Sequence, residues 1–310
     1  MAQAPSSPTL ALLAPGAMGA AIAARLSSFG AGTILTNLDG RSDATLERAR
    51  ATNMVHASYA EIVERATCIY SVVPPVDAAG VAEAVLRAYK DAGSERELVF
   101  ADCNAVNPES VKRMAALFDG TGITFLDGVI IGLPPTDGWN PGIYVSAAPE
   151  DTAVLDEFTL MSTKFGLNVL PLKGEGAGIG DASALKMSHG GIVKGTIGLF
   201  TTMILAANAA SPSTAEGLLH ALNLSQPTFV DLIIRFIPHM LPKAYRFVGE
   251  MEEVSGFVGD SGARTYEGLA GIFARVAKAQ EDSPERGGEG DVALLLKFVE
   301  EARKTRETKP

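Results

Sequence analysis

The stretch Thr9-Leu-Ala-Leu-Leu-Ala14-Pro-Gly16-Ala-Met-Gly19 decides the fold of this chain. It begins as an apolar run typical of a buried strand, turns sharply, and continues into a segment with helical spacing. Gly16 and Gly19 fit the second and third glycines of the strand–turn–helix pattern that binds dinucleotides, and Ala14 takes the place of the first. The second glycine lets the backbone approach a pyrophosphate, and the third lets helix and strand pack closely. A glycine-bearing turn without a ligand is the alternative interpretation.

Short β-rich runs alternate with helix-like segments from Thr9 to about Leu172. This alternation is typical of βαβ units, whose strands form a parallel sheet. The predicted strands are Thr9–Leu13, Gly32–Thr36, Thr67–Val73, Leu98–Asp102, Ile123–Asp127, Gly142–Ala147 and Leu167–Leu170. The predicted helices between them are Met18–Phe29, Ser42–Ala51, Val76–Lys90, Pro108–Phe118 and Asp151–Phe165. The sequence therefore predicts an α/β Rossmann domain in the first half of the chain.

The pattern changes near Gly174, and from Asp181 onward it is helical with almost no strand signal. A helix from roughly Asp181 to Ala209 would be about 40 Å long, and it is apolar on nearly all sides, so we expect it to be buried. Later helices are expected to break at Ser211-Pro, Gln226-Pro, Ile237-Pro and Leu241-Pro, and a last one begins at Asp291. We predict a disordered end at 1–8, a dinucleotide-binding Rossmann domain at 9–173, and an all-helical substrate and dimerisation domain at 174–310.

Composition narrows the possible partners and the compartment. The net charge of −10 excludes the basic stripe that nucleic-acid binding needs. The apolar segments are interrupted by polar residues or glycine, so no membrane span is expected. Two cysteines, Cys68 and Cys103, give no disulfide framework, and the four histidines lack metal-ligand spacing, so no metal is expected. We therefore expect a cytoplasmic protein that acts on a small molecule.

The residues after the second predicted strand bear on the choice of cofactor. Asn37 lies at the expected strand end, and Asp39 stands where an acidic residue would bind the ribose 2′-hydroxyl of NAD. Arg41 and Ser42 could instead hold a 2′-phosphate, the arginine through a forked, charge-assisted pair. An Asp-Gly turn followed by a helix cap at Ser42 or Asp43 is the purely structural interpretation. We favour NADP, with NAD possible.

A glycine-rich turn runs into the long helix at Gly176-Ala-Gly-Ile-Gly-Asp-Ala-Ser-Ala-Leu-Lys186-Met-Ser-His189. Lys186 and His189 are three residues apart and share a helical face. No acidic residue lies closer to the lysine than Asp181, so we expect a lysine that faces a cleft. It could stabilise the charge that develops on a carbonyl oxygen and deliver the proton. A lysine that reaches solvent from a buried helix, and a neutral core histidine, are the alternatives.

These motifs resemble the β-hydroxyacid dehydrogenase and 6-phosphogluconate dehydrogenase superfamily. The resemblance is carried by Gly16-Ala17-Met18-Gly19, by Asp102-Cys-Asn-Ala-Val-Asn-Pro108, and by Lys186-Met-Ser-His189. Arg246-Phe-Val-Gly-Glu-Met-Glu-Glu-Val254 looks like an incompletely characterised oxidoreductase branch of it. The likeness covers nearly the whole chain, and it implies a helical second domain of the 6-phosphogluconate dehydrogenase type.

The resemblance also implies roles for particular residues. Lys186 would be the catalytic lysine, with His189 a candidate substrate contact on the same helical face. Val73 and Pro74 would line the nicotinamide side of the site, and Asn104 would lie near both cofactor and substrate. The cofactor-binding turn would comprise Gly16, Ala17, Met18 and Gly19.

Two departures from the superfamily pattern affect the expected substrate. Gly190 stands where an asparagine is common, and Ile131-Gly132-Leu133 stands where a Ser-Gly-Gly segment is common. Both missing polar groups help to hold the substrate in the acid dehydrogenases. The resemblance therefore implies a more apolar pocket than usual.

Three functions are compatible with these patterns. The first is an NADP-dependent oxidoreductase acting on a small carbonyl/alcohol pair, with Lys186 as general acid/base. The second is an imine reductase on the same fold, which a protonated lysine disfavours because an iminium is cationic. The third is a non-catalytic nucleotide-binding protein. A homodimer is expected, with the long helix and the C-terminal helices at its interface.

Overall fold

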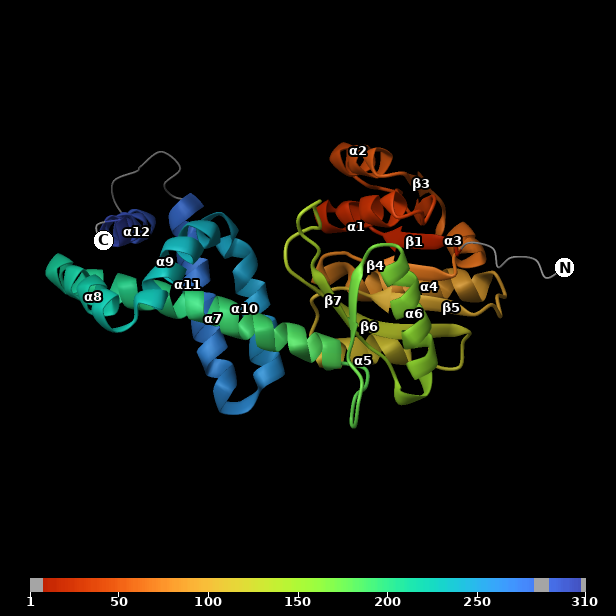
Figure 1. The fold of residues 1–310 in the computed structure, drawn as a ribbon. Helices are drawn as coiled ribbons and strands as arrows, with labels where there is room; N and C mark the ends of the chain where they lie inside the picture. The colour runs from red at the N-terminus through yellow and green to blue at the C-terminus, as the bar shows by residue number, and fades with distance from the viewer. Residues whose placement is uncertain (1–7, 282–289, 308–310) are drawn as a thin grey trace. The chain divides into compact units, whose positions relative to one another are not determined.

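A computed structural model describes residues 8–281 and 290–307 of the chain (Figure 1). The predicted disordered end at 1–8 lies outside the described residues, apart from Pro8. The chain divides into two compact units, Met1–Lys186 and Met187–Pro310. The first unit is α/β and the second is all-helical, so the predicted fold class is confirmed.

The first unit is built on one eight-stranded sheet with the order β3-β2-β1-β4-β5-β6-β7-β8. Its strands are β1 (Leu10–Leu13), β2 (Ile34–Thr36), β3 (Met54–His56), β4 (Cys68–Ser71), β5 (Leu98–Asp102), β6 (Ile123–Ile131), β7 (Gly142–Ser146) and β8 (Asn168–Pro171). Neighbouring strands from β3 to β6 pair in parallel, β7 pairs antiparallel to β6, and β8 runs parallel to β7. The central strands β1, β2 and β4 are buried along their whole length and mostly apolar, because both faces of the sheet are covered there.

Helices cover both faces of this sheet. They are α1 (Ala17–Ser28), α2 (Asp43–Ala51), α3 (Tyr59–Arg65), α4 (Ala78–Asp91), α5 (Pro108–Ala116) and α6 (Thr152–Lys164), with short 3₁₀ turns at Pro75–Asp77 and Pro149–Asp151. One core cluster joins α1 and α6 to the sheet, through side chains such as Ile22 and Phe158. The other cluster joins α3, α4 and α5, through Ile62, Val85 and Val111.

Two elements of the first unit, β3 and α3, were not predicted. Strand β3 has three residues, of which Met54 alone is buried, so the sequence carries almost no apolar alternation there. Helix α3 has seven residues and begins with a capping box, in which Ser58 and Glu61 satisfy each other's backbone N–H groups. Both elements are too short for periodicity to reveal them.

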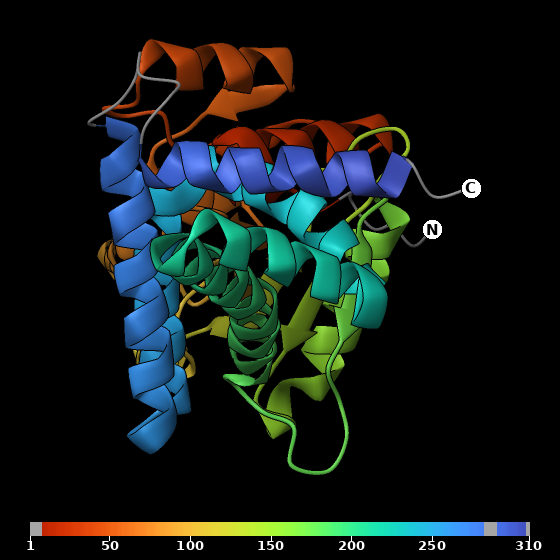
Figure 2. The same cartoon turned by 90° about the vertical axis from the view of Figure 1, so that its left-hand side faces the viewer.

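The second unit consists of packed helices (Figure 2). They are α7 (Asp181–Ala210), whose first six residues belong to the first unit, α8 (Pro212–Ser225), α9 (Pro227–Met240), α10 (Ala244–Val258), α11 (Asp260–Glu281) and α12 (Asp291–Glu307), with a 3₁₀ turn at Leu241–Lys243. Helices α10 and α11 form a hairpin that turns at Gly259, whose φ of +63° favours glycine. Phe273 of α11 and Leu295 of α12 are among the fully buried core residues of the second unit.

The predicted proline breaks are confirmed at Ser211-Pro and Gln226-Pro, where α8 and α9 begin with the proline as first residue. The break predicted at Ile237-Pro is wrong, because Pro238 lies inside α9. It occupies the last turn of that helix, which ends at Met240. A proline there removes only one of the final backbone hydrogen bonds, so the helix tolerates it.

Helix α7 begins at Asp181 as predicted, and the two units meet within it, between Lys186 and Met187. The sequence placed the domain boundary earlier, after residue 173. The first turn of α7 belongs to the first unit because Asp127 of β6 accepts hydrogen bonds from Gly180 and Ser183. Among the described residues, α7 alone is long and apolar enough to span a membrane, a criterion that core helices of soluble proteins also meet.

Candidate functional site

The sheet order places a topological switch point at the carboxyl end of β1. Strand β1 has β2 on one side and β4 on the other, so the crossover direction reverses at this point. Ligands of open α/β sheets bind at such a switch point. The Ala14 N–H donates to the Val72 carbonyl at 3.2 Å, which joins the glycine turn to the segment that carries Val73 and Pro74. The structure thus brings two predicted cofactor segments together.

The two glycines of the turn differ in what surrounds them. A Cβ on Gly19 would lie 2.2 Å from the Ala14 carbonyl oxygen and 2.8 Å from Leu12 Cδ2. A Cβ on Gly16 would meet nothing within 4 Å. Gly19 is therefore required by helix–strand packing, whereas the space beside Gly16 stays open for a ligand. Ala17 and Met18 follow in the first turn of α1, which has no side-chain cap, so its first N–H groups can bind phosphate.

Asn37 and Asp39 form a compact turn at the carboxyl end of β2. The buried Asn37 amide donates to Asp39 Oδ2 at 2.9 Å and to the Ala57 carbonyl at 3.3 Å. Its oxygen accepts the Asp39 N–H at 3.2 Å. His56, on the adjacent β3, accepts the Leu38 N–H and lies 3.7 Å from Asp39 Oδ1. The Asn37 side chain therefore holds this turn together through hydrogen bonds to Asp39 and Ala57.

Arg41 lies beside this turn with an unused donor. Its Nε is buried and has no hydrogen-bond partner in the part of the chain that the structure describes. Burial raises the pKa of Tyr59 on α3, and the nearby Arg41 charge partly opposes that rise. Ser42 is exposed and is the N-cap of α2, with its hydroxyl 3.1 Å from Thr45 Oγ1. A buried guanidinium N–H without an acceptor fits a site that accepts an anion.

Sequence reasoning missed Arg48, which lies on α2. Its Nε donates to the Pro15 carbonyl at 3.0 Å, inside the glycine turn, and its Nη2 donates to Thr45 at 2.9 Å. The arginine thus places a positive charge beside the predicted pyrophosphate position. No local pattern indicates this role, because the two contacting segments are 33 residues apart.

Asn104 connects the ends of β4 and β5. Its amide nitrogen donates to Asp102 Oδ1 at 2.5 Å and to Ser71 Oγ at 2.9 Å, and its oxygen accepts the Val73 N–H at 2.7 Å. The side chain is only 3% exposed. Both amide donors are therefore used within the protein, and Asn104 fixes the Val73–Pro74 segment rather than presenting a donor to substrate.

Lys186 lies at the extended end of β6. Its Nζ donates to the Ile130 carbonyl at 2.7 Å, and the residue is half-buried. Burial lowers the pKa of Lys186 below its ordinary value of 10.5, because desolvation disfavours the charged form. An ammonium has three N–H donors, so two remain after the bond to Ile130. At the carboxyl edge of the sheet in the first unit, the glycine turn follows β1, Val73–Pro74 follow β4 and Asn104 follows β5. Lys186 of α7 reaches the end of β6.

Comparison with known proteins agrees with this arrangement. Residues 9–133 match the family model described as the NAD binding domain of 6-phosphogluconate dehydrogenase. This segment is therefore similar to that NAD-binding domain. Residues 209–276 match a domain of unknown function, DUF1932. The comparison with curated proteins found no match.

Solved structures with the same fold cover nearly the whole chain. A conserved protein of unknown function, described as structurally similar to 3-hydroxyacid dehydrogenases, is 25% identical with a TM-score of 0.67, over 88% of this chain and 98% of that one. The 3-hydroxyisobutyrate dehydrogenase of Mycobacterium tuberculosis is 17% identical with a TM-score of 0.57, over 94% of this chain and 99% of that one. An imine reductase variant from Myxococcus stipitatus is 18% identical with a TM-score of 0.53, over 94% of this chain and 99% of that one. The resemblance seen in the sequence is confirmed.

His189 belongs to the second unit, outside the NAD-binding domain, and its side chain is exposed. Its contact with substrate remains a prediction. Lys194, further along α7, pairs with Glu250 and lies 5.2 Å from the centre of the Phe247 ring. Among the residues described, no cluster of three or more His, Cys, Asp or Glu could hold a metal ion.

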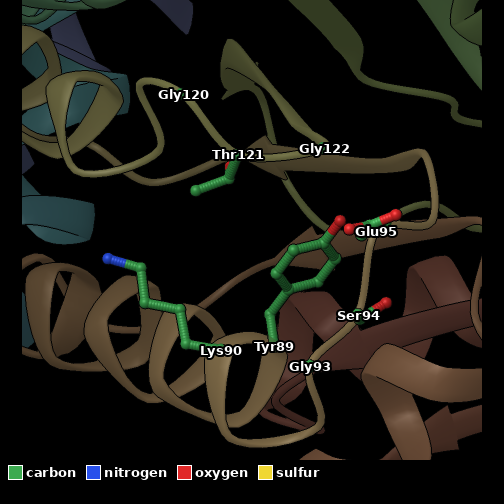
Figure 3. Close-up of a pocket in the computed structure, with 8 residues that line it drawn as sticks. All are labelled: Tyr89, Lys90, Gly93, Ser94, Glu95, Gly120, Thr121 and Gly122. Carbon is green, nitrogen blue, oxygen red and sulfur yellow. The ribbon is translucent and has the colours of Figure 1, made fainter.

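A shallow hollow lies at the opposite end of the sheet from the glycine turn (Figure 3). Its lining includes Tyr89 and Lys90 from the end of α4 and Gly122 before β6. Tyr89 Oη donates to the Arg96 carbonyl at 2.7 Å, and a Cβ on Gly122 would lie 2.3 Å from that hydroxyl. Because these strands begin here, the hollow is not at the edge where α/β sheets bind ligands. We assign it no catalytic role.

Asp102 gives the NAD-binding domain a testable dependence of stability on pH. Its side chain is fully buried, and burial raises its pKa from 3.8 to about 7. Between these two pH values the folded protein holds a proton that the unfolded chain has lost. The free energy of unfolding therefore falls as pH rises through this window, by up to about 4 kcal/mol for a shift of this size.

We expect Asp102→Asn to remove most of this dependence. Asparagine keeps an oxygen for the Asn104 amide and carries no charge at any pH. Urea unfolding at pH 5 and pH 8 measures the effect: the wild type should lose stability between the two, and the variant should lose much less. Parallel losses in both proteins would show that Asp102 is ionised throughout.

Proposed function

We propose that the protein is an NADP-dependent oxidoreductase that acts on a small, relatively apolar carbonyl/alcohol pair, with Lys186 as its general acid/base. The observation that carries this proposal is the half-buried Lys186 ammonium at the carboxyl edge of the sheet, which donates to the Ile130 carbonyl. The NAD-binding domain and the fold support a nicotinamide cofactor. A bound nicotinamide supplies or accepts the hydride.

The chain's own residues would divide the remaining work. Ala17 and Met18 would bind the pyrophosphate through backbone N–H groups, Gly16 would leave room for it, and the Arg48 charge would lie beside it. Asn104 would hold Val73–Pro74 against the nicotinamide side. Lys186 would donate a hydrogen bond to the substrate oxygen and then a proton during reduction, and would accept that proton during oxidation.

The substrate proposal rests on the side chains at the end of β6. Ile131, Gly132 and Leu133 provide no hydroxyl or charge there, and Leu133 is 68% exposed. Such a surface suits an apolar ketone or aldehyde better than a hydroxy acid, whose carboxylate needs polar partners. An imine reductase is the second candidate, since the lowered pKa of Lys186 reduces its repulsion of a cationic iminium.

Matched panels of ketones, aldehydes, 3-hydroxy acids and cyclic imines test the proposal. We expect oxidation of NADPH with apolar carbonyl compounds, followed by absorbance, and little turnover of hydroxy acids. Turnover of imines alone, unaffected by loss of the Lys186 amine, would instead establish the imine reductase. Cofactor binding without turnover on any panel would indicate a nucleotide-binding protein that is not an enzyme.

Arg41 provides the test of cofactor preference. We expect Arg41→Ala to weaken NADPH binding by about 10- to 100-fold, since a charge-assisted hydrogen bond contributes about 1.5–3 kcal/mol. NADH binding should change little, because NADH has no 2′-phosphate. Fluorescence titration of both cofactors measures the two affinities. Equal losses for NADPH and NADH would contradict the assignment of Arg41 to the 2′-phosphate.

We also propose a cytoplasmic homodimer. Ile192, Leu199 and Met203 of α7 are exposed and lie on one helical face at seven- and four-residue spacing. A second copy that packs on this face would remove it from water. Both cysteines are free thiols, which suits a reducing compartment.

A further inference from the structure

Asp127 of β6 is fully buried and accepts four hydrogen bonds. Its Oδ2 accepts the N–H of Gly180 at 3.0 Å, the N–H of Ser183 at 3.1 Å and the hydroxyl of Ser146 at 3.1 Å. Its Oδ1 accepts the Ser183 hydroxyl at 2.8 Å. Three of the four donors therefore belong to the start of α7, and the fourth belongs to β7.

These contacts satisfy the amino end of α7 from outside the helix. The Ser146 hydroxyl, which donates to Asp127, also accepts the Ala182 N–H at 3.2 Å. The first N–H groups of a helix lack internal partners, and a carboxylate there also interacts favourably with the helix dipole. Burial raises the pKa of Asp127, and these hydrogen bonds oppose that rise. The first turn of α7 is thus attached to two strands.

The same strand also holds the end of the Lys186 side chain. Ser183 and Lys186 are one helical turn apart on α7, and Asp127 and Ile130 are three residues apart on β6. Asp127 binds the helix at Ser183, and the Ile130 carbonyl accepts the Lys186 Nζ at 2.7 Å. Two attachments to β6 therefore define where the ammonium lies.

We propose that Asp127 is the positioning residue for Lys186: by fixing the first turn of α7 on β6, it keeps the ammonium half-buried beside Ile130. The role in catalysis rests on the proposed function, whereas the positioning is a property of the folded chain. Asp127 acts through Lys186, because all four of its contacts are to protein groups. Its neighbouring titratable groups are Asp102, its register partner on β5, and the buried Cys103 thiol.

Two substitutions separate position from charge. Asp127→Ala removes the acceptor of all four bonds, so the start of α7 keeps only the Ala182 bond to Ser146 there, and Lys186 becomes more solvated. Asp127→Asn removes the charge only: the amide oxygen can accept the three bonds made to Oδ2, and the amide N–H can donate to the Ser183 hydroxyl. The asparagine variant should therefore behave like the wild type.

Competitive acetylation with acetic anhydride across pH, read by peptide mass spectrometry, reports the titration of Lys186 without any turnover. In the wild type we expect its labelling midpoint to lie below the ordinary lysine value of 10.5. Asp127→Ala should move the midpoint up towards that value, and Asp127→Asn should leave it unchanged. If Asp127→Ala does not fold, the double variant Ser146→Ala/Ser183→Ala, which removes two of the four bonds, should show a smaller upward shift.

Turnover supplies the second measurement. We expect Asp127→Ala to lower kcat by about 100-fold, the cost of misplacing a reacting group by about 1 Å. The pH above which the reductive rate falls should move upward in that variant only. Asp127→Asn should restore both quantities.

An unchanged labelling midpoint in Asp127→Ala, or in the double variant if the first does not fold, would overturn the proposal. Equal shifts in the alanine and asparagine variants would overturn it too, because they would show an effect of charge. If the midpoints move as expected but the protein neither binds NADPH nor turns over any substrate, the proposed function is wrong and the positioning of Lys186 stands.

Discussion

Lys186→Met is expected to lower kcat/KM by about 10²- to 10⁴-fold, the usual contribution of a positioned general acid or base. NADPH affinity should stay unchanged, since the cofactor contacts that we assign lie in the segments that follow β1, β2 and β4. Methionine has nearly the same length and apolar volume as the lysine stem, so the change removes the ammonium and little else. Steady-state kinetics and a cofactor titration measure the two effects.

The stability of this variant distinguishes a catalytic lysine from a structural one. Burial lowers the pKa of Lys186, so below its ordinary value of 10.5 the folded state binds the proton less readily than the unfolded chain does. The charged lysine therefore costs stability at neutral pH, and this cost disappears as pH rises towards 10.5. We expect Lys186→Met to melt at the same temperature as the wild type or higher. Lost activity together with a lower melting temperature would point to a structural role.

Lys90→Met is the matched control. Lys90 is an exposed lysine on α4, beside the hollow at the other end of the sheet (Figure 3). The same substitution there should leave kcat/KM and its pH profile unchanged. In the wild type, the reductive rate should fall as pH rises through the lowered pKa of Lys186, and the oxidative rate should rise through the same range.

Local patterns were enough to predict most of the fold. The apolar run and turn at Thr9–Gly19, the strand–helix alternation, and the start of α7 at Asp181 all have signals within about ten residues. Strand β3 and helix α3 were missed because three and seven residues are too few to show a period. The helix break predicted at Pro238 was wrong because the effect of a proline depends on its position in the helix, which the Ile-Pro dipeptide alone does not reveal.

The sequence identified several residues of the candidate site, but not the hydrogen bonds that they make. Sequence spacing identified Lys186 and Asn104, yet their partners lie 56 and 31 residues away. The contacts show that Asn104 fixes a loop and that Asp127, which sequence reasoning treated only as a strand end, holds the start of α7. Arg48 likewise reaches the glycine turn from another helix. Such long-range hydrogen bonds leave no periodic signal in one sequence.

Gly19→Ala is expected to destabilise the first unit by about 3 kcal/mol or more, the upper end of the usual cost of overpacking. The new Cβ would lie 2.2 Å from the Ala14 carbonyl oxygen, which is backbone and cannot rotate away. Helix α1 would have to move off β1, and the turn that binds phosphate would move with it. Thermal unfolding should show a melting temperature lower by about 10 °C, and NADPH binding should be lost.

Gly16→Ala is the matched variant, three residues away in the same turn. Gly16 has φ −66° and ψ −176°, which alanine adopts freely, and its Cβ would meet no atom within 4 Å. We expect an unchanged melting temperature and NADPH binding weakened by about tenfold, because the added Cβ would occupy the open space through which the pyrophosphate approaches the turn. Equal effects of the two substitutions on melting temperature would contradict this division. Full NADPH affinity in Gly16→Ala would show that the pyrophosphate does not lie against this turn.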